Sequence, residues 1–133
     1  MPLQKLNNKN INKTILIVED EVSLLQPLSK KIKQEGFHTL EAKNGAEALM
    51  ILLKNKVDLV LLDIVMPVMD GITVLQKMRA DKKMKNVPVI ILTNLTDDHK
   101  MAEALENGAY DFLVKSDLQL EDIIKKIKDK LTM

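Results

Sequence analysis

The sequence predicts an α/β protein with a doubly wound, five-stranded parallel sheet and five helices. Short apolar runs alternate along the chain with amphipathic segments of helical length, so strands and helices follow one another in turn. All but one of the strand segments are continuous apolar runs, which is typical of parallel strands covered on both faces. Right-handed crossovers then place helices on both faces of a single sheet.

The first strand–helix unit begins with the apolar run Thr14–Val18. Ser23 is the expected N-cap of the helix that follows, and Gly36 is expected to end it. Pro27 falls within the opening turns, where the missing N–H costs less than in a helix interior. The predicted strands are 14–18, 37–42, 57–62, 87–92 and 109–114, and the helices after them are 23–36, 44–53, 72–81, 97–108 and 120–131.

The second and third units are bounded by turn residues. Asn44-Gly45 opens the second helix, whose apolar residues recur at helical spacing. The third strand ends at Asp63, and the following segment 66–71 contains Pro and Asp-Gly, which stop a strand and turn the chain. The third helix then runs to about Asp81.

The fourth and fifth units complete the sheet. The fourth strand ends at Thr93, and Asp97-Asp98 suits the N-terminal dipole of the next helix, which Gly108 ends. The fifth strand ends at Lys115, and the last helix has one apolar face. Its polar side carries Lys125, Lys126, Lys128 and Lys130, which are expected to form a solvated surface, with docking of an acidic partner as the alternative.

The chain is expected to form one domain, residues 14–131, preceded by a flexible arm. Its 133 residues suffice for a single hydrophobic core. Residues 1–13 are rich in Asn and Lys and show no periodicity, which is typical of a loose terminus.

Composition excludes several functional classes. The net charge of +1 and an aromatic content of 2% give no basis for nucleic-acid binding, so none is expected. The absence of cysteine excludes disulfides and thiolate metal sites. No signal peptide and no membrane-spanning run is visible, so we expect a cytoplasmic protein that does not bind a membrane.

Charged and polar residues gather just after the predicted strands. Glu19 and Asp20 follow the first strand, Asp63 the third, Thr93 the fourth and Lys115 the fifth. The carboxyl ends of parallel strands meet at one sheet edge, where ligands bind in open α/β sheets. Clustered carboxylates repel one another, and an all-oxygen ligand set suits Mg²⁺. Hydroxyl and ammonium donors beside them favour an anionic group, so the pattern points to phosphoryl transfer.

Four sequence segments resemble the response-regulator receiver domain, the family of the single-domain bacterial chemotaxis regulator. The resemblance spans roughly residues 14–131, and any one segment alone would be a weak signal. It implies a flavodoxin-like fold with strand order 2-1-3-4-5. The segments are Ile15-Leu16-Ile17-Val18-Glu19-Asp20, Leu61-Leu62-Asp63-Ile64-Val65-Met66-Pro67-Val68-Met69-Asp70-Gly71, Ile91-Leu92-Thr93 and Gly108-Ala109-Tyr110-Asp111-Phe112-Leu113-Val114-Lys115.

The resemblance implies a metal site and an acceptor. Asp63 is the phosphoacceptor in this interpretation, receiving the group from phosphohistidine. Asp20 and Asp63 bind Mg²⁺ directly, together with the backbone carbonyl of Val65. Glu19 acts largely through a coordinated water.

The resemblance also implies a switch. Lys115 pairs with Asp63 and then contacts the phosphoryl group, Thr93 moves toward the phosphoryl oxygens, and Phe112 is the switch aromatic. The fourth helix, fifth strand and fifth helix form the expected readout surface. Gly71 lets the chain turn before the third helix.

The expected function is therefore that of a phosphoacceptor signalling module in a two-component or phosphorelay system, and not of a metabolic enzyme. Autophosphorylation from phosphohistidine or small phosphodonors and autodephosphorylation are its only expected reactions. Its partners would be a histidine kinase or histidine phosphotransferase and an unknown downstream protein, with the chain a monomer or weak homodimer. The sequence shows no output domain after the last helix, so direct transcriptional control by this chain is not expected unless the chain is a fragment.

Two alternatives remain open. An aspartyl-phosphate hydrolase on a similar sheet needs a second Asp two residues after the nucleophile, where this chain has Val65, and usually a cap domain. A degenerate receiver would act only as a binding platform, although Asp20, Asp63, Thr93 and Lys115 are all present.

The chain departs from the family pattern at three positions. Glu19 replaces the commoner Asp, and Ser116 stands where the family usually has a proline with a cis peptide bond. A non-proline cis bond costs about 2.5–4 kcal/mol, so we predict either a trans Lys115-Ser116 bond with a changed loop or a strained cis one. Asn94 is bulkier than the usual residue after Thr93, which predicts altered access to the phosphoryl group.

Overall fold

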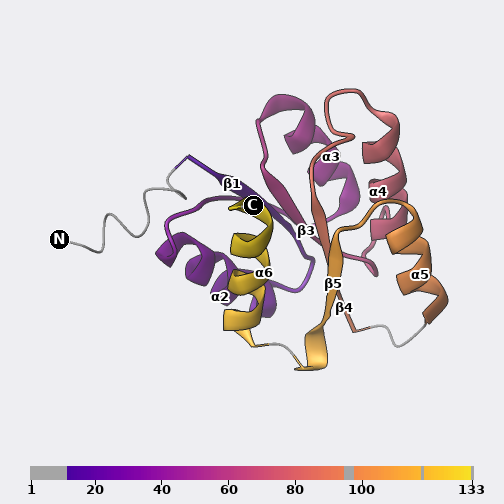
Figure 1. The fold of residues 1–133 in the computed structure, drawn as a ribbon. Coiled ribbons are helices and arrows are strands. Elements are labelled where there is room, and N and C mark those ends of the chain that lie inside the picture. Colours follow the sequence, from indigo (N-terminus) through magenta and orange to yellow (C-terminus); the bar gives the residue numbers. More distant parts are fainter. Residues whose placement is uncertain (1–11, 95–97, 118, 133) are drawn as a thin grey trace.

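The computed structural model describes residues 12–94, 98–117 and 119–132. It contains a five-stranded parallel sheet in the order β2-β1-β3-β4-β5 (Figure 1). The predicted fold class and strand order are confirmed. The elements are β1 Thr14–Val18, α2 Val22–Gln34, β2 His38–Ala42, α3 Gly45–Lys54, β3 Leu59–Asp63, α4 Gly71–Ala80, β4 Val89–Thr93, α5 Asp98–Glu106, β5 Asp111–Val114, the 3₁₀ turn η1 Lys115–Asp117, and α6 Leu120–Leu131.

Two hydrophobic cores lie on opposite faces of the sheet, each under its own helical layer (Figure 1). Along β1, Leu16 and Val18 point into the core that α3, α4 and α5 cover, while Ile15 and Ile17 point into the core under α2 and α6. This alternation follows from the two-residue period of a strand. The apolar faces of the helices therefore meet both sides of the sheet, as the doubly wound prediction requires.

The strands differ in burial according to their place in the sheet. All five residues of β3 and of β4 are buried. β5 is only half-buried along its length, because it lies at the sheet edge with a neighbour on one side. Its two faces are both covered, as predicted, since Phe112 packs against one core and Leu113 against the other.

The first helix begins earlier than predicted. α2 starts at Val22 with Glu21 as its N-cap, so Ser23 is a helical residue and not the cap. The carboxylate of Glu19 accepts the backbone N–H of Glu21 at 3.0 Å, a local bond between residues two apart that fixes the chain there. Pro27 consequently lies beyond the first four helical positions, where its missing N–H does cost an intrahelical bond.

Two other helix starts are closed by their N-cap side chains. Asn44 Oδ1 accepts the N–H of Glu47 at 2.9 Å at the start of α3, as the Asn44-Gly45 pattern indicated. Asp70 Oδ1 accepts the N–H of Thr73 at 2.9 Å at the start of α4. The expectation for residues 1–13 falls largely on residues 1–11, and that for Asp97 on 95–97, and both ranges lie outside the described residues.

None of the helices in the described ranges combines the length and apolar character needed to cross a membrane.

The lysines of α6 are engaged within the molecule. Two of them tie the helix to other elements, Lys128 to Glu35 at 2.6 Å and Lys126 to Asp111 at 2.5 Å. Lys125 pairs with Asp129 along the helix, and Lys130 lies 4.8 Å from the ring centroid of Tyr110. This basic stretch therefore contributes to the packing of α6 on α2 and β5, and is not a freely solvated face.

Lowering the pH is expected to weaken the link between α2 and α6. The ammonium of Lys128 lowers the pKa of Glu35 below its usual 4.5. Stability from a carboxylate with a lowered pKa is present above the unfolded value and is lost as the pH falls through the folded value. We expect Glu35→Gln to lose less than about 1 kcal/mol at pH 7, because the pair is partly exposed, and to equal wild type below the folded pKa.

Urea unfolding of both proteins between pH 7 and pH 3 measures this difference. Glu41→Gln, at an exposed position on β2, is the matched control. A Glu35→Gln deficit that does not shrink on acidification would contradict the prediction.

A half-buried arginine, Arg79, joins the segments that lead into β4 and β5. The guanidinium group of Arg79 donates to the carbonyl oxygens of Lys85 and Val87 at 3.1 and 2.9 Å, and to that of Gly108 at 2.9 Å. Gly108 has φ +90°, and a Cβ there would lie 2.7 Å from Arg79 Nε. Glycine is required at this position for both reasons.

Candidate functional site

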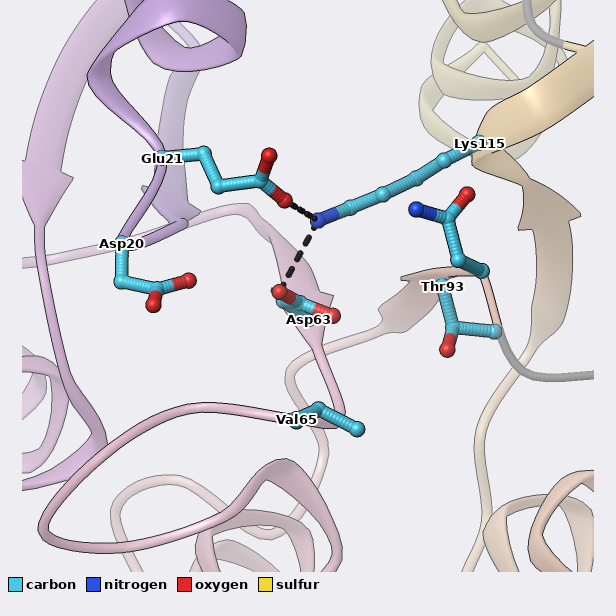
Figure 2. Close-up of a pocket in the computed structure, with 7 residues that line it drawn as sticks. Asp20, Glu21, Asp63, Val65, Thr93 and Lys115 are labelled. Carbon is cyan, nitrogen blue, oxygen red and sulfur yellow. Dashed lines mark hydrogen bonds and ion pairs between the residues drawn. The ribbon is translucent and has the colours of Figure 1, made fainter.

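A pocket of about 340 Å³ opens at the carboxyl edge of the sheet (Figure 2). The side chains come from the ends of β1, β3, β4 and β5 and from the first residues after them. The site residues predicted from strand ends therefore lie together, although Glu19 is fully buried and does not line the pocket. Phe112, which the resemblance implied, does not line the pocket either. The residues lining the pocket are Asp20, Glu21, Asp63, Val65, Thr93, Asn94 and Lys115.

Lys115 is the centre of the charge arrangement. Its ammonium lies 2.9 Å from Asp63 Oδ2, 2.7 Å from Glu19 Oε1 and 3.1 Å from Glu21 Oε1. Figure 2 shows the lysine reaching across the pocket, from the start of η1 just after β5, to Asp63 and Glu21. Burial alone would lower the pKa of Lys115, but the three carboxylates outweigh it and raise that pKa above its usual value.

Burial disfavours the charged forms of the two buried carboxylates, Asp63 and Glu19. Burial raises the pKa of Asp63, and the ammonium of Lys115 and the backbone N–H of Val65 only partly oppose this. Burial likewise raises the pKa of Glu19, which is fully buried. Glu19 Oε1 forms a close ion pair with Lys115 at 2.7 Å, which opposes the effect of burial on that pKa without cancelling it. An added cation would relieve both groups.

The acidic cluster fits a divalent cation. Carboxylate oxygens of Glu19, Asp20, Glu21 and Asp63 lie within 4.8 Å of one another. A set made only of oxygen donors, partly open to water, matches the coordination that Mg²⁺ prefers.

The loop after β3 is held tightly beneath the site. Gly71 N–H donates to the carbonyl of Ile64 at 2.8 Å, which closes the loop on itself. A Cβ on Gly71 would lie 2.2 Å from the carbonyl oxygen of Asp63. Within the loop, Val68 has φ +71°, and Met69 N–H bonds the carbonyl of Pro67 at 2.8 Å. The backbone of the residues after Asp63 is thus fixed by close contacts.

Thr93 and Phe112 occupy different environments. Thr93 is fully buried at the end of β4, opposite Val114 in β5, and lines the pocket. Phe112 is half-buried on β5, opposite Ile91, and packs against the core under α3, α4 and α5. Phe112 lies three residues before Lys115 and does not line the pocket.

The chain leaves β5 through the short 3₁₀ turn η1. No cis peptide bond occurs among the described residues, so Lys115-Ser116 is trans, the first of the two predicted outcomes. Lys115–Asp117 forms a 3₁₀ turn, which directs the lysine side chain into the pocket.

Glu21 was not predicted as a site residue, yet it lines the pocket and contacts Lys115. The signal in the sequence was the third acidic residue in Glu19-Asp20-Glu21. It was passed over because the direction of this side chain depends on where α2 begins, which the sequence placed too late.

A family model described as the response regulator receiver domain matches residues 15–128. The DNA-binding response regulator MtrA of Mycobacterium tuberculosis strain H37Rv is 35% identical over 117 residues, 88% of this chain and 50% of that protein. The probable transcriptional regulator ycf27 of Porphyra purpurea is 38% identical over 129 residues, 93% of this chain and 52% of that protein.

Solved structures of response regulators have the same fold. A two-component response regulator from Clostridium difficile superimposes with a TM-score of 0.85 at 30% identity, covering 91% of this chain and 97% of that one. A CheY-like receiver domain protein from Methanospirillum hungatei gives 0.84 at 28% identity, covering 90% and 94%. The chain spans about half the length of the curated relatives that it matches.

Proposed function

The chain belongs to the response regulator receiver domain family of two-component signalling, and from this premise we propose that Asp63 is its phosphoacceptor. The observation that carries the proposal is the contact at 2.9 Å between the Asp63 carboxylate and the Lys115 ammonium, inside a pocket that is open to solvent and lined by further carboxylates. A carboxylate held beside a cation in a solvent-accessible pocket is placed to act as a nucleophile.

In the proposed reaction a carboxylate oxygen of Asp63 attacks the phosphorus of a phosphohistidine. A P–O bond forms as the P–N bond breaks, and the histidine nitrogen leaves. Lys115 then transfers its hydrogen bond from Asp63 to a phosphoryl oxygen, and the hydroxyl of Thr93 donates to another. The N–H of Val65, which supports the Asp63 carboxylate, keeps the acceptor in place.

The residues that would hold Mg²⁺ are Asp20, Asp63 and the backbone carbonyl of Val65, with Glu19 acting through a coordinated water. When bound, the ion supplies positive charge that neutralises the acidic cluster and the incoming phosphoryl oxygens. The close carboxylate cluster and the burial of Glu19 support this assignment.

Phosphorylation would work as a charge switch. It adds about −1.5 to −2 charges and three acceptor oxygens. Thr93 and Lys115 stand at the ends of neighbouring strands, β4 and β5, so donors that follow the new charge would shift both strand ends. Phe112 would be re-posed with β5, and the surface of α5, β5 and α6 would carry the signal. Moving such an element from 1:99 to 99:1 takes about 5.5 kcal/mol.

The proposed partners are a histidine kinase or histidine phosphotransferase and a downstream protein that reads the α5–β5–α6 surface. The chain would act in the cytoplasm as a monomer or weak homodimer, and its only reactions would be phosphoryl uptake and autodephosphorylation. An aspartyl-phosphate hydrolase is disfavoured, because Val65 stands where a second catalytic Asp is needed and its side chain is 61% exposed.

Intact-mass measurement with Mg²⁺ and a small phosphodonor tests the proposal. We expect wild type to gain one phosphoryl group and Asp63→Ala to gain none. Asp70→Ala, which removes an N-cap carboxylate on the same loop, is the matched control and should still be modified. Uptake by Asp63→Ala, or none by wild type, would refute the assignment.

Asn94 is expected to control the lifetime of the aspartyl phosphate. It lines the pocket directly after Thr93 and its side chain is exposed, so it stands between solvent and the acceptor. Asn94→Ala opens this path to water and is expected to shorten the lifetime by a factor of a few. Loss of the phosphoryl mass over time measures the lifetime, and an unchanged decay rate would contradict the prediction.

A further inference from the structure

Glu21 uses its side chain differently from Asn44 and Asp70, the N-caps of α3 and α4. Asn44 and Asp70 each cap their own helix with a side-chain hydrogen bond to the third residue. Glu21 is the N-cap of α2 but makes no such bond. Its carboxylate reaches instead to Lys115 Nζ at 3.1 Å, a residue 94 positions away in the sequence.

The backbone beneath Glu21 is fixed by the site itself. Glu19 Oε2 accepts the Glu21 N–H at 3.0 Å, while Glu19 Oε1 lies 2.7 Å from the same ammonium that Glu21 contacts. Glu19 and Asp63 approach Lys115 from buried positions, whereas the Glu21 side chain is 56% exposed. Glu21 therefore holds the lysine from the solvent side, where a phosphodonor must enter.

We propose that Glu21 is a positioning residue that holds Lys115 at the mouth of the pocket and competes with the phosphoryl group for its ammonium. The proposal rests on Asp63 being the phosphoacceptor. A negative charge at this point attracts a divalent cation to the acidic cluster and repels a dianionic phosphoryl group. Glu21 thus favours cation binding and opposes the phosphorylated state.

The opposite effects on the affinity for a divalent cation and on the affinity for a phosphoryl group distinguish this role from a purely structural one. An exposed ion pair that only stabilises the fold would change stability slightly and leave both affinities unchanged. Loss of a helix-terminal charge would act on the folded protein as a whole, again without opposite effects on the two ligands.

The experiment compares wild type, Glu21→Gln and Glu41→Gln. Glu41→Gln removes the same charge from an exposed position on β2, opposite Ile17 of β1, away from Lys115. NMR titrations measure the affinity for Mg²⁺ alone and then, at saturating Mg²⁺, the affinity for beryllofluoride, a phosphoryl mimic. We expect Glu21→Gln to weaken Mg²⁺ binding about three- to tenfold and to strengthen beryllofluoride binding by a similar factor.

Glu21→Asp, which keeps the charge on a shorter side chain, should fall between wild type and Glu21→Gln in both titrations. Unchanged affinities, changes of the same sign, or equal changes in Glu41→Gln would overturn the role of Glu21 while leaving Asp63 as acceptor. A wild-type protein that binds Mg²⁺ but not beryllofluoride would overturn the proposed function and this inference together.

Discussion

Replacing Gly71 with alanine is expected to lower the free energy of unfolding by about 3 kcal/mol and to displace Asp63. The added Cβ would lie 2.2 Å from the Asp63 carbonyl oxygen, 2.9 Å from Ile64 Cα and 3.0 Å from the Asp63 carbonyl carbon. All three obstacles are backbone atoms, which cannot rotate away as a side chain can. The loop must therefore open or the end of β3 must shift, and either change moves the carboxylate in the pocket.

Chemical denaturation measures the loss of stability, and intact mass after phosphodonor treatment measures the effect on the acceptor. Lys77→Ala, at an exposed position on the same helix, is the control and should stay within about 0.5 kcal/mol of wild type. A Gly71→Ala protein as stable as Lys77→Ala would show that the contact between the loop and Asp63 is looser than the structure has it.

Replacing Lys115 with methionine is expected to cost about 2–4 kcal/mol at pH 7, because it leaves buried carboxylates without their cation. The side chains of Glu19 and Asp63 are 0% and 5% exposed, so water solvates the two carboxylates poorly once the ammonium is removed. Methionine keeps much of the aliphatic volume of the lysine and removes only the charge. The variant isolates the electrostatic contribution from the packing of the side chain.

The pH dependence of this loss has a definite sign. Burial already raises the pKa values of Glu19 and Asp63, and removing Lys115 raises them further. A carboxyl whose pKa is raised in the folded state costs stability above that pKa and none below the unfolded value. The deficit of Lys115→Met should therefore shrink as the pH falls through these raised values.

Mg²⁺ should also reduce the deficit. Without the Lys115 ammonium the acidic cluster binds the cation more tightly, so mass action stabilises the variant more than wild type. Urea unfolding at several pH values, with and without Mg²⁺, measures both effects. Lys125→Met is the control, because Lys125 is 73% exposed and pairs only within α6. A deficit that grows on acidification would contradict the electrostatic explanation.

The fold could be predicted because strand and helix periods are local properties of the sequence. The buried runs that became β3 and β4 have no alternative placement in a domain of this size. The apolar run of β5 does not reveal its half-burial, which follows from the edge place that the implied strand order 2-1-3-4-5 gives it. The start of α2 was missed because the bond from Glu21 N–H to Glu19, two residues away, competes with the capping preference of Ser23.

The residues of the site could be predicted from the strand ends, but the distances between their side chains could not. Asp63 and Lys115 stand 52 residues apart, and only the parallel sheet brings their side chains to 2.9 Å. The burial of Glu19 and the reach of Glu21 depend on the direction of the chain between β1 and α2. The outcome at Ser116 needed the structure, since the sequence allowed two isomers and the trans form leads into η1.

Arg79 fixes the amino ends of β4 and β5, the two strands of the proposed switch. Its bonds to Val87 and Gly108 hold the segments entering β4 and β5 together at the amino edge of the sheet. Thr93 and Lys115 lie at the opposite ends of these strands. Because Arg79 holds the two strands together at their amino ends, they can move apart only at their carboxyl ends. Any spreading of β4 from β5 is therefore smallest beside the guanidinium group and largest beside Asp63, where the phosphoryl group would act.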